Sequence, residues 1–359
     1  MGQPSFVIEF TRKAVTAISR SQQGIACLVL DDDVMTGDTL TYSSFGDIKS
    51  TDLSSTNYEL VQMAFLGKPA KVVVVKKQED IADTVAILKR TKFNYLAMPS
   101  AVAADITAIK TELDAERENL KGFGKAVFYN PATGSDDQRI IELSGCDELS
   151  LNFTGTAKTY TGAQYTCRIA GILAGLPDTV AATYTNLPEI VSCDVANNPD
   201  SEADSGHICI LYEFGEYKLG RAVNSLVTLT DGISADFKKI RIVSTMDLIA
   251  EDIVTTFRNS YVGKYVNSYQ NKLRFCGAVN SYLKALQPNL LDENMRNEVW
   301  VSYAKNKAYL EAQGIDTSNL SEQEIIQYNT GSYVGLDGAA APTDVMEDLE
   351  LDVNLFEEM

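Results

Sequence analysis

The single histidine of the chain, His207, lies two residues after Ser205, and serine and histidine are the nucleophile and base of many hydrolases. A GxSxG motif commonly holds such a serine in a strained turn, and the sequence has no such motif. A histidine-based metal site needs several ligands at coordinating spacing, and one histidine without paired cysteines does not supply them. These residues therefore predict neither a hydrolytic triad nor a metal centre.

Three consecutive aspartates, at positions 31–33, follow an apolar run and carry the carboxylate oxygens that Mg²⁺ prefers. Acidic residues at the end of a strand more often form its exit turn, which is the interpretation that we adopt. No GxGxxG or Walker-type glycine loop follows an expected strand, so a phosphate cradle is not indicated. The other acids are scattered, and we predict no catalytic residue, cofactor, metal or enzyme activity.

The composition is that of a soluble globular protein, with 359 residues for two or three domains, 45% of them hydrophobic and 22% charged. There is no run of 18 apolar residues and no secretory signal, so we expect no direct membrane partner. The cysteines lack CxxC spacing and mostly lie in apolar stretches, which predicts buried thiols and synthesis in a reducing cytoplasm. They are Cys27, Cys146, Cys167, Cys193, Cys209 and Cys276.

The net charge of −18 opposes binding to nucleic acid, whose affinity for proteins comes mainly from lysine and arginine. Residues 337–359 contain eight acids and no base, whereas residues 238–284 contain eight bases and three acids. The basic segment predicts a local electropositive face and an acidic partner. A solvated helix face balanced by acids elsewhere explains the same pattern, and the sequence leaves both interpretations open.

Strand and helix patterns alternate between residues 24 and 130, which is typical of a mostly parallel sheet with helices packed on it. We therefore predict an α/β fold, α+β overall. The expected strands are Ile25–Leu30, Val72–Val75, Phe93–Met98 and Lys125–Tyr129, and the expected helices are Tyr58–Leu66, Ile81–Lys89 and Ala101–Leu120.

Residues 131–205 are less regular, with short strands expected at Ile140–Leu143 and Leu149–Phe153. A helix is expected at Ala163–Leu176, and its Gly171 and Gly175 predict close packing of another element against a small-residue face.

The remainder of the chain begins with an expected hairpin, in which 208–214 and 217–223 flank a type II′ turn at Gly215-Glu216. A strand is expected at Ile240–Val243, and helices at 244–269, 274–287 and 297–313. A capping box at Ser321-x-x-Glu324 predicts the start of a short fourth helix.

Both termini carry the period-2 pattern of a half-buried strand next to a loose tether. At the C-terminus the apolar positions Val345, Leu349, Leu351, Val353 and Leu355 alternate with mostly acidic residues; at the N-terminus they are Phe6, Ile8 and Phe10. An unpaired strand invites pairing with another chain. These strands either fold back onto their own sheet or are donated to another subunit, and the pattern alone leaves both possibilities open.

Six segments together resemble contractile tail sheath proteins of phages and R-type bacteriocins (tailocins), above all the diffocin-like sheaths of Gram-positive bacteria. The resemblance covers nearly the whole chain, and none of these segments is catalytic. The segments are Phe93–Pro99, Arg168–Pro177, Gly220–Leu226, Ile240–Ile249, Tyr261–Tyr269 and Asn329–Ser332.

The resemblance implies an N-terminal arm at 1–23, an outer α/β domain at 24–130 and its second, connecting part at 131–205. It further implies a C-terminal sheath core at 206–337 and a C-terminal arm at 338–359. In this family the arms add strands to the sheets of neighbouring subunits, and a helix of the core faces the tail tube. The tube-facing candidates implied here are Arg258, Lys264, Lys272 and Arg274.

The implied function is that of a structural subunit in a contractile injection system. It would polymerise helically, as stacked hexameric rings around a tail tube, and contract to drive the tube through a target cell envelope. Its partners would be other copies of itself, the tube protein, and baseplate and tail terminator proteins, in a released phage tail or bacteriocin particle. The alternative is an α/β small-molecule-binding or hydrolytic enzyme with a helical second domain. The sequence does not separate a phage sheath from that of a bacteriocin or of a cellular injection system.

Overall fold

The computed structural model describes residues 17–129 and 134–353, which group into two compact units. The sheet unit contains the described residues of 21–251 and those from 344 onward. The helical unit contains residues 252–343 together with the described residues before 21. The five-segment division expected from the sequence stays a prediction.

The sheet unit is built on a seven-stranded sheet with the strand order β10-β6-β5-β4-β1-β3-β2. All neighbouring strands are parallel except β2 and β3, which confirms the mostly parallel sheet expected from the alternating pattern. The strands are β1 (Ile25–Leu30), β2 (Thr39–Tyr42), β3 (Lys71–Lys76), β4 (Tyr95–Ala97), β5 (Lys125–Tyr129), β6 (Ile140–Leu143) and β10 (His207–Ile208).

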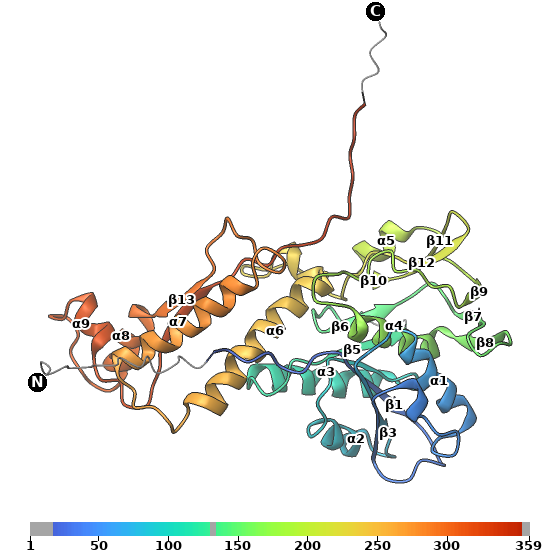
Figure 1. The fold of residues 1–359 in the computed structure, drawn as a ribbon, viewed down its shortest axis with the longest axis horizontal. Helices are drawn as coiled ribbons and strands as arrows, with labels where there is room; N and C mark the ends of the chain where they lie inside the picture. The colour runs from blue at the N-terminus through green and yellow to red at the C-terminus, as the bar shows by residue number, and fades with distance from the viewer. Residues whose placement is uncertain (1–16, 130–133, 354–359) are drawn as a thin grey trace, which may run out of the picture. The chain divides into compact units, whose positions relative to one another are not determined.

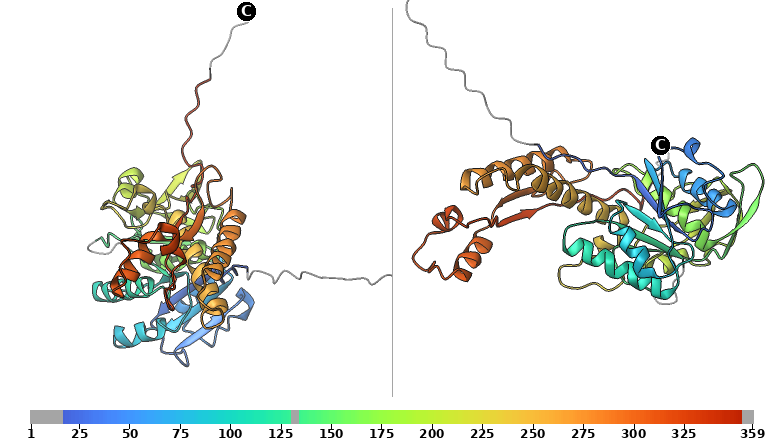
Figure 2. Two further views of the ribbon diagram at one scale, coloured as in Figure 1. Left: turned by 90° about the vertical axis from the view of Figure 1, so that its left-hand side faces the viewer. Right: turned by 90° about the horizontal axis from the view of Figure 1, so that it is seen from below.

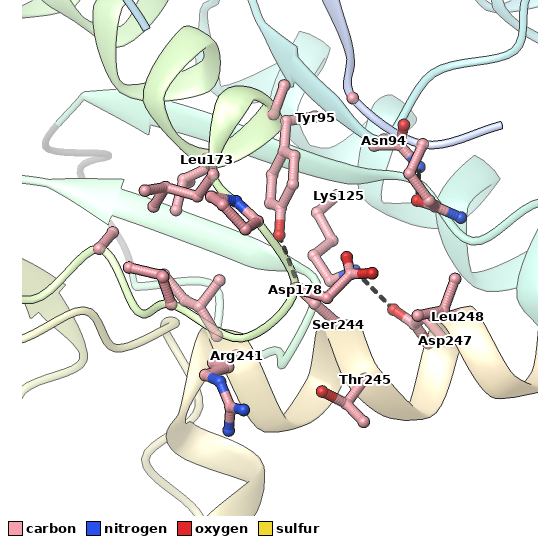
Figure 3. Close-up of a pocket in the computed structure, with 18 of the residues that line it drawn as sticks. Asn94, Tyr95, Lys125, Leu173, Asp178, Arg241, Ser244, Thr245, Asp247 and Leu248 are labelled. Atoms are coloured by element: carbon pink, nitrogen blue, oxygen red, sulfur yellow. Dashed lines mark hydrogen bonds and ion pairs between the residues drawn. The ribbon is translucent and has the colours of Figure 1, made fainter. Parts of the chain in front are cut away.

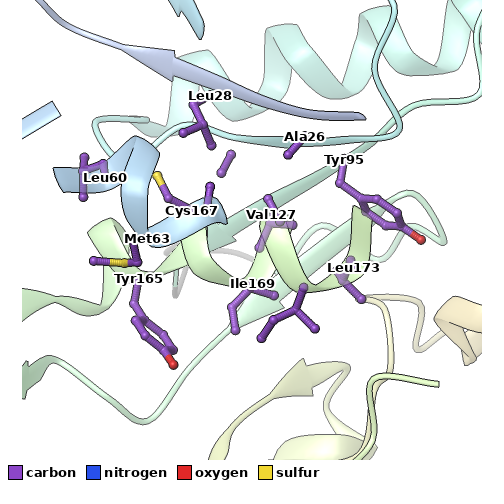
Figure 4. Close-up of a cluster of buried hydrophobic side chains, with 14 of the residues drawn as sticks. Ala26, Leu28, Leu60, Met63, Tyr95, Val127, Tyr165, Cys167, Ile169 and Leu173 are labelled. Atoms are coloured by element: carbon purple, nitrogen blue, oxygen red, sulfur yellow. The ribbon is translucent and has the colours of Figure 1, made fainter. Parts of the chain in front are cut away.

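Helices cover both faces of this sheet (Figure 1). Helices α1 (Ser55–Phe65) and α4 (Gly162–Gly175) pack on one face, and α2 (Ile81–Leu88) and α3 (Ala103–Glu118) on the other. Strand β1 shows the reason, because its alternate residues Ala26 and Leu28 belong to one buried cluster and Cys27 to the other. Figure 4 shows the cluster between α1, α4 and the sheet.

Helices α1 and α4 approach each other through glycine, as the spacing of Gly171 and Gly175 predicted. A Cβ atom on Gly171 would collide with the main chain of Ala64, and one on Gly175 would collide with the carbonyl of Gly67. Any side chain at these positions would push the helices apart. The sequence interpretation of a close-packed small-residue face is therefore confirmed.

Smaller elements complete the sheet unit. A three-stranded sheet contains β7 (Glu148–Leu151), β8 (Lys158–Thr161) and β9 (Ile190–Cys193), and α5 (Pro199–Asp204) precedes β10. Short 3₁₀ turns lie at Phe45–Asp47 and Ala235–Lys238.

The expected hairpin is present as β11 (Ile210–Glu213) and β12 (Glu216–Leu219), but its turn was wrong by one residue. The turn is Phe214-Gly215, with φ of 52° and 86°. Two positive φ values in a two-residue loop define type I′ instead of type II′.

Helix α6 (Ile240–Thr256) corrects two expectations. The run Ile240–Val243 is its first turn and not a strand, because four β-branched and basic residues are too short a window to separate the two periods. The helix also ends earlier than 269, in a single π-helical turn at Phe257–Tyr261.

The helical unit contains α7 (Tyr269–Ala285), α8 (Tyr303–Ala312) and α9 (Glu322–Gln327). The predicted helix at 297–313 was wrong at its start, where β13 (Glu298–Val301) pairs with β14 (Leu336–Ala339) in an antiparallel ladder. The β-propensity of Val-Trp-Val explains this, and Ser302 then caps α8. The capping box at Ser321 is confirmed, because Ser321 and Glu324 each bond the backbone of the other.

Candidate assembly interface

The C-terminal segment, residues 344–353, is extended and lies in no strand or helix (Figure 2). Among the described residues, nothing accepts or donates a backbone hydrogen bond along 346–353. The side chains of Leu349, Leu351 and Val353 are 88%, 71% and 69% exposed, whereas Val345 is half-buried. Leu355 lies outside the described residues. The exposed part combines unpaired main chain with a row of apolar side chains, which is the character of a strand without its partner.

Ion pairs fix the start of this segment to the sheet unit. The buried carboxylate of Glu347 accepts a hydrogen bond from Thr183 Oγ1 at 2.6 Å and pairs with Lys239 and Arg221. Lys239 also pairs with Asp344 at 3.0 Å, and Arg221 with Asp348 at 2.5 Å. We call Thr183, Arg221, Lys239 and Glu347 the root clamp.

The electrostatics of the root clamp favour the charged forms. Burial alone would lower the pKa of Lys239, but its hydrogen bonds to Glu347 and Asp344 outweigh burial and raise it. The hydrogen bond with Asp348 raises the pKa of the Arg221 guanidinium. The clamp therefore holds the start of the segment at one place and leaves residues 349–353 free to reach outward.

The ladder of β13 and β14 has one edge occupied at Val299 and an outer edge that is open at Gly338, although Lys305 Nζ donates to the Leu336 carbonyl of that outer edge at 2.7 Å. The side-chain amide of Asn280 donates to the Val299 carbonyl at 3.1 Å and accepts from the Val299 N–H at 2.6 Å, so a side chain fills this edge of β13. Because Val299 directs its main chain to Asn280, its partner Gly338 directs its own away from β13. Gly338 is exposed, and no described residue hydrogen-bonds its main chain. The β14 edge can therefore accept a strand at Gly338, and pairing that extends to Leu336 requires Lys305 to release its carbonyl.

Three of the four tube-facing candidates are on the surface of the helical unit. Arg258, Lys264 and Arg274 are exposed, and Arg274 donates to the Asn271 side chain at 3.1 Å. Lys272 is buried and donates to Thr330 Oγ1 at 2.8 Å, and burial lowers its pKa. Lys272 thus makes its contact inside the helical unit and does not lie on the surface with the other three candidates.

The predicted N-terminal arm strand, Phe6, Ile8 and Phe10, lies outside the described residues. The described residues that follow it are tied to the helical unit. The backbone N–H of Ser19 donates to Thr256 Oγ1 at 3.0 Å, and Arg20 pairs with Asp252 at 3.5 Å.

The aspartate and the histidine that were considered for metal binding or catalysis make hydrogen bonds and ion pairs within the fold. Asp32 accepts hydrogen bonds from Asn57 and from the backbone of Ser54 and Met35. Burial would raise its pKa, but these hydrogen bonds dominate and lower it to about 2, so the exit-turn interpretation is confirmed. His207 lies 3.4 Å from Glu142 and 2.9 Å from Glu202, and its ring is not bonded to Ser205.

The cysteines are free thiols, all buried except the half-buried Cys193, which agrees with the sequence interpretation. Burial raises the pKa of Cys193, Cys209 and Cys276 to about 11, so these thiols stay protonated at neutral pH. In the described part of the chain, no group of three or more His, Cys, Asp or Glu side chains is arranged to hold a metal. No described helix is long and apolar enough to cross a bilayer.

An ionic network that no sequence pattern predicted lies beside a small cavity in the sheet unit, and its Lys125 and Asp247 help to line that cavity (Figure 3). Asp247 on α6 pairs with Lys125 at 2.6 Å and with Arg117, and Tyr95 shares a 2.6 Å hydrogen bond with Ser244. The cavity of about 70 Å³ is too small for most metabolites. We call Arg117, Lys125 and Asp247 the anchor network, because it fastens the first half of α6 to the sheet.

Comparison with known proteins gives a consistent result. The phage tail sheath C-terminal domain family matches residues 234–318. The tail sheath protein of Clostridium phage phiCD119 is 33% identical, over 97% of this chain and 98% of that protein.

Solved structures share the fold. A sheath tail protein from Desulfitobacterium hafniense aligns with a TM-score of 0.68 at 16% identity, covering 83% of this chain and 93% of its own. The helical sheath of the anti-feeding prophage in its contracted state aligns with a TM-score of 0.70 at 15% identity, covering 99% of each chain.

Proposed function

The chain belongs to the phage tail sheath family, and we propose that it polymerises helically around a tail tube by donating its terminal strands to neighbouring copies. The observation that carries this proposal is the exposed alternating row Leu349, Leu351 and Val353 on an unpaired main chain. Covering these side chains and pairing this backbone both favour addition to a sheet edge of another copy.

The acceptor that we propose is the edge of β14. Its Gly338 faces outward without a main-chain partner among the described residues, whereas Asn280 occupies the edge of β13. An incoming strand would extend the ladder to three strands and gain main-chain hydrogen bonds along its length. The N-terminal positions Phe6, Ile8 and Phe10 would form the second donated strand.

Polymerisation follows from the geometry of such a contact. The donated segment and the acceptor edge are different surfaces of the chain, so the contact is heterologous and extends into a helical polymer when the rotation does not close. The root clamp sets where each arm leaves its own copy. Main-chain bonds in the arms would persist while weaker surface contacts rearrange, which allows an extended sheath to pass to a contracted one without falling apart.

The tube contact that we propose is electrostatic. Arg258, Lys264 and Arg274 present positive charge on the helical unit of a chain whose net charge is −18.

Reversing Lys264 and Arg274 to Glu should weaken assembly on the tube more than self-polymerisation, as measured by cosedimentation with purified tube at two salt concentrations. If tube-dependent assembly of this variant were unchanged, the basic surface of Arg258, Lys264 and Arg274 would not be the tube contact. Baseplate and terminator contacts belong to the same proposal, and a chain of similar fold occurs in the baseplate structure of the anti-feeding prophage.

Deletion of residues 349–359 tests the strand donation. The variant keeps the root clamp, so it should unfold at the wild-type temperature and remain a monomer in sedimentation velocity. Electron microscopy should show no tubes. The matched control is Glu350→Gln with Asp352→Asn, which changes only the polar positions and should assemble normally. Normal tubes from the deletion variant would refute the proposal.

A further inference from the structure

The turn of the β11–β12 hairpin places an aromatic residue where proteins seldom place one. Phe214 has φ of 52° and its side chain is 99% exposed. A bulky residue in the left-handed region is strained, and a type I′ turn favours Asn or Gly at this position. Full exposure also leaves the ring without contacts that would offset the strain. Such an outlier points to a function for the ring outside its own chain.

The hairpin presents this ring on a rigid, acidic tip. Tyr212 and Tyr217 lie on facing strands with ring centroids 4.7 Å apart, which stiffens the hairpin below the turn. Glu213 and Glu216 flank the turn directly, and only Glu216 has a basic neighbour, Lys218 at 3.7 Å, among the described residues. The tip is therefore an apolar plug between two carboxylates.

A pocket of complementary character lies between the end of α2 and α3. It has a volume of about 260 Å³, larger than the engineered cavity of roughly 150 Å³ that accommodates benzene. Its apolar lining is contributed by Leu88, Phe93, Ile109, Leu113 and Phe123. A phenyl ring fits such a space in size and polarity.

The rim of this pocket carries basic residues. Lys89 pairs with Glu112 at 3.0 Å, and Lys92 pairs with Glu251. Arg90 and Lys121 are exposed and make no ion pair within residues 17–129 and 134–353. Glu116 also lines the pocket and makes no ion pair within the described residues, so the unpaired charges beside the pocket are two cations and one acid. The net charge of these groups is positive, opposite in sign to the two acids beside Phe214.

The hairpin cannot fill the pocket of its own chain. Ile210 and Leu219 of the hairpin belong to the buried cluster on the α1–α4 face of the sheet. Leu88 and Ile109 of the pocket belong to the cluster on the opposite, α2–α3 face. Figure 1 shows the hairpin and α2 on opposite sides of the sheet unit.

We propose that Phe214 of one copy inserts into the α2–α3 pocket of a second copy, with Glu213 and Glu216 facing Arg90 and Lys121. This contact rests on the proposed function, since it is a second contact between sheath subunits, independent of the arms. Plug and pocket are different surfaces, so the contact is heterologous and propagates along a polymer.

The test measures the critical concentration for assembly of the full-length chain, by sedimentation and electron microscopy. Phe214→Asn suits the turn and removes the ring, so the monomer should unfold at or above the wild-type temperature. Its critical concentration should rise roughly 10-fold to 100-fold, as expected for losing one buried phenyl ring. Glu213→Lys with Glu216→Lys should also weaken assembly, and adding Arg90→Glu with Lys121→Glu should restore it.

Assembly of Phe214→Asn at the wild-type concentration would overturn the proposal, and so would failure of the charge exchange to restore assembly. The deletion of 349–359, run in parallel, separates the two proposals. If the deletion blocks assembly and Phe214→Asn does not, the insertion of Phe214 into the pocket is refuted and strand donation is supported. A wild-type chain that forms no polymer would overturn both.

Discussion

The anchor network and the root clamp use the same chemistry, but the central ion pair of the anchor network is buried on both sides, whereas the basic partners in the root clamp are partly exposed. In the anchor network the side chains of Lys125 and Asp247 are each 4% exposed, and Arg117 at the margin of the network is 23% exposed. In the root clamp the partners of Glu347 are Arg221, 39% exposed, and Lys239, 22% exposed. A dry ion pair is costly to break, whereas a partly wet one exchanges with water and salt. The anchor network therefore suits a helix, α6, that must stay in place. The root clamp suits the C-terminal segment, which must extend away from the sheet unit from a defined point.

The largest effect expected from this comparison is that of Asp247→Ala. The substitution leaves the Lys125 ammonium buried without its carboxylate, so the free energy of unfolding should fall by about 3–5 kcal/mol. Urea denaturation followed by circular dichroism measures it. A loss of unfolding free energy below about 1 kcal/mol would show that the network does not hold α6 on the sheet.

The root clamp should give a smaller effect. Glu347→Gln keeps the shape and the contact with Thr183 but removes the charge that faces Lys239 and Arg221, so the loss should be about 1.5–3 kcal/mol in dilute buffer. In 1 M salt the difference from wild type should shrink, which is not expected for Asp247→Ala.

Asp348→Asn is the matched control for the clamp. This carboxylate pairs with the same Arg221 but is 78% exposed, so the unfolding temperature should not change measurably. Equal losses for Glu347→Gln and Asp348→Asn would contradict the assignment of the clamp to Glu347.

Local sequence patterns were enough to predict the central strands of the sheet unit and the helices between them. The apolar runs that became β1, β3 and β5 are short and buried on both faces, so their pattern depends little on the rest of the chain. Gly171 and Gly175 likewise predicted that another element packs closely on α4, and the structure identifies that element as the end of α1 with the residues that follow it.

Long-range contacts could not be predicted in this way. The root clamp joins Thr183, Arg221, Lys239 and Glu347, which no sequence period relates. The burial of Lys272 depends on Thr330, which is 58 positions away. The strand expected at Ile240–Val243 shows the same limit, since packing against the sheet unit, and not local propensity, decides in favour of the helix.

Hydrogen–deuterium exchange of residues 349–353 tests strand donation most directly. In the monomer these amides have no partner in the described part of the chain, so they should exchange within seconds. In assembled tubes they should be protected by orders of magnitude, together with the amide of Gly338 on β14. Fast exchange of residues 349–353 in intact tubes would contradict the account.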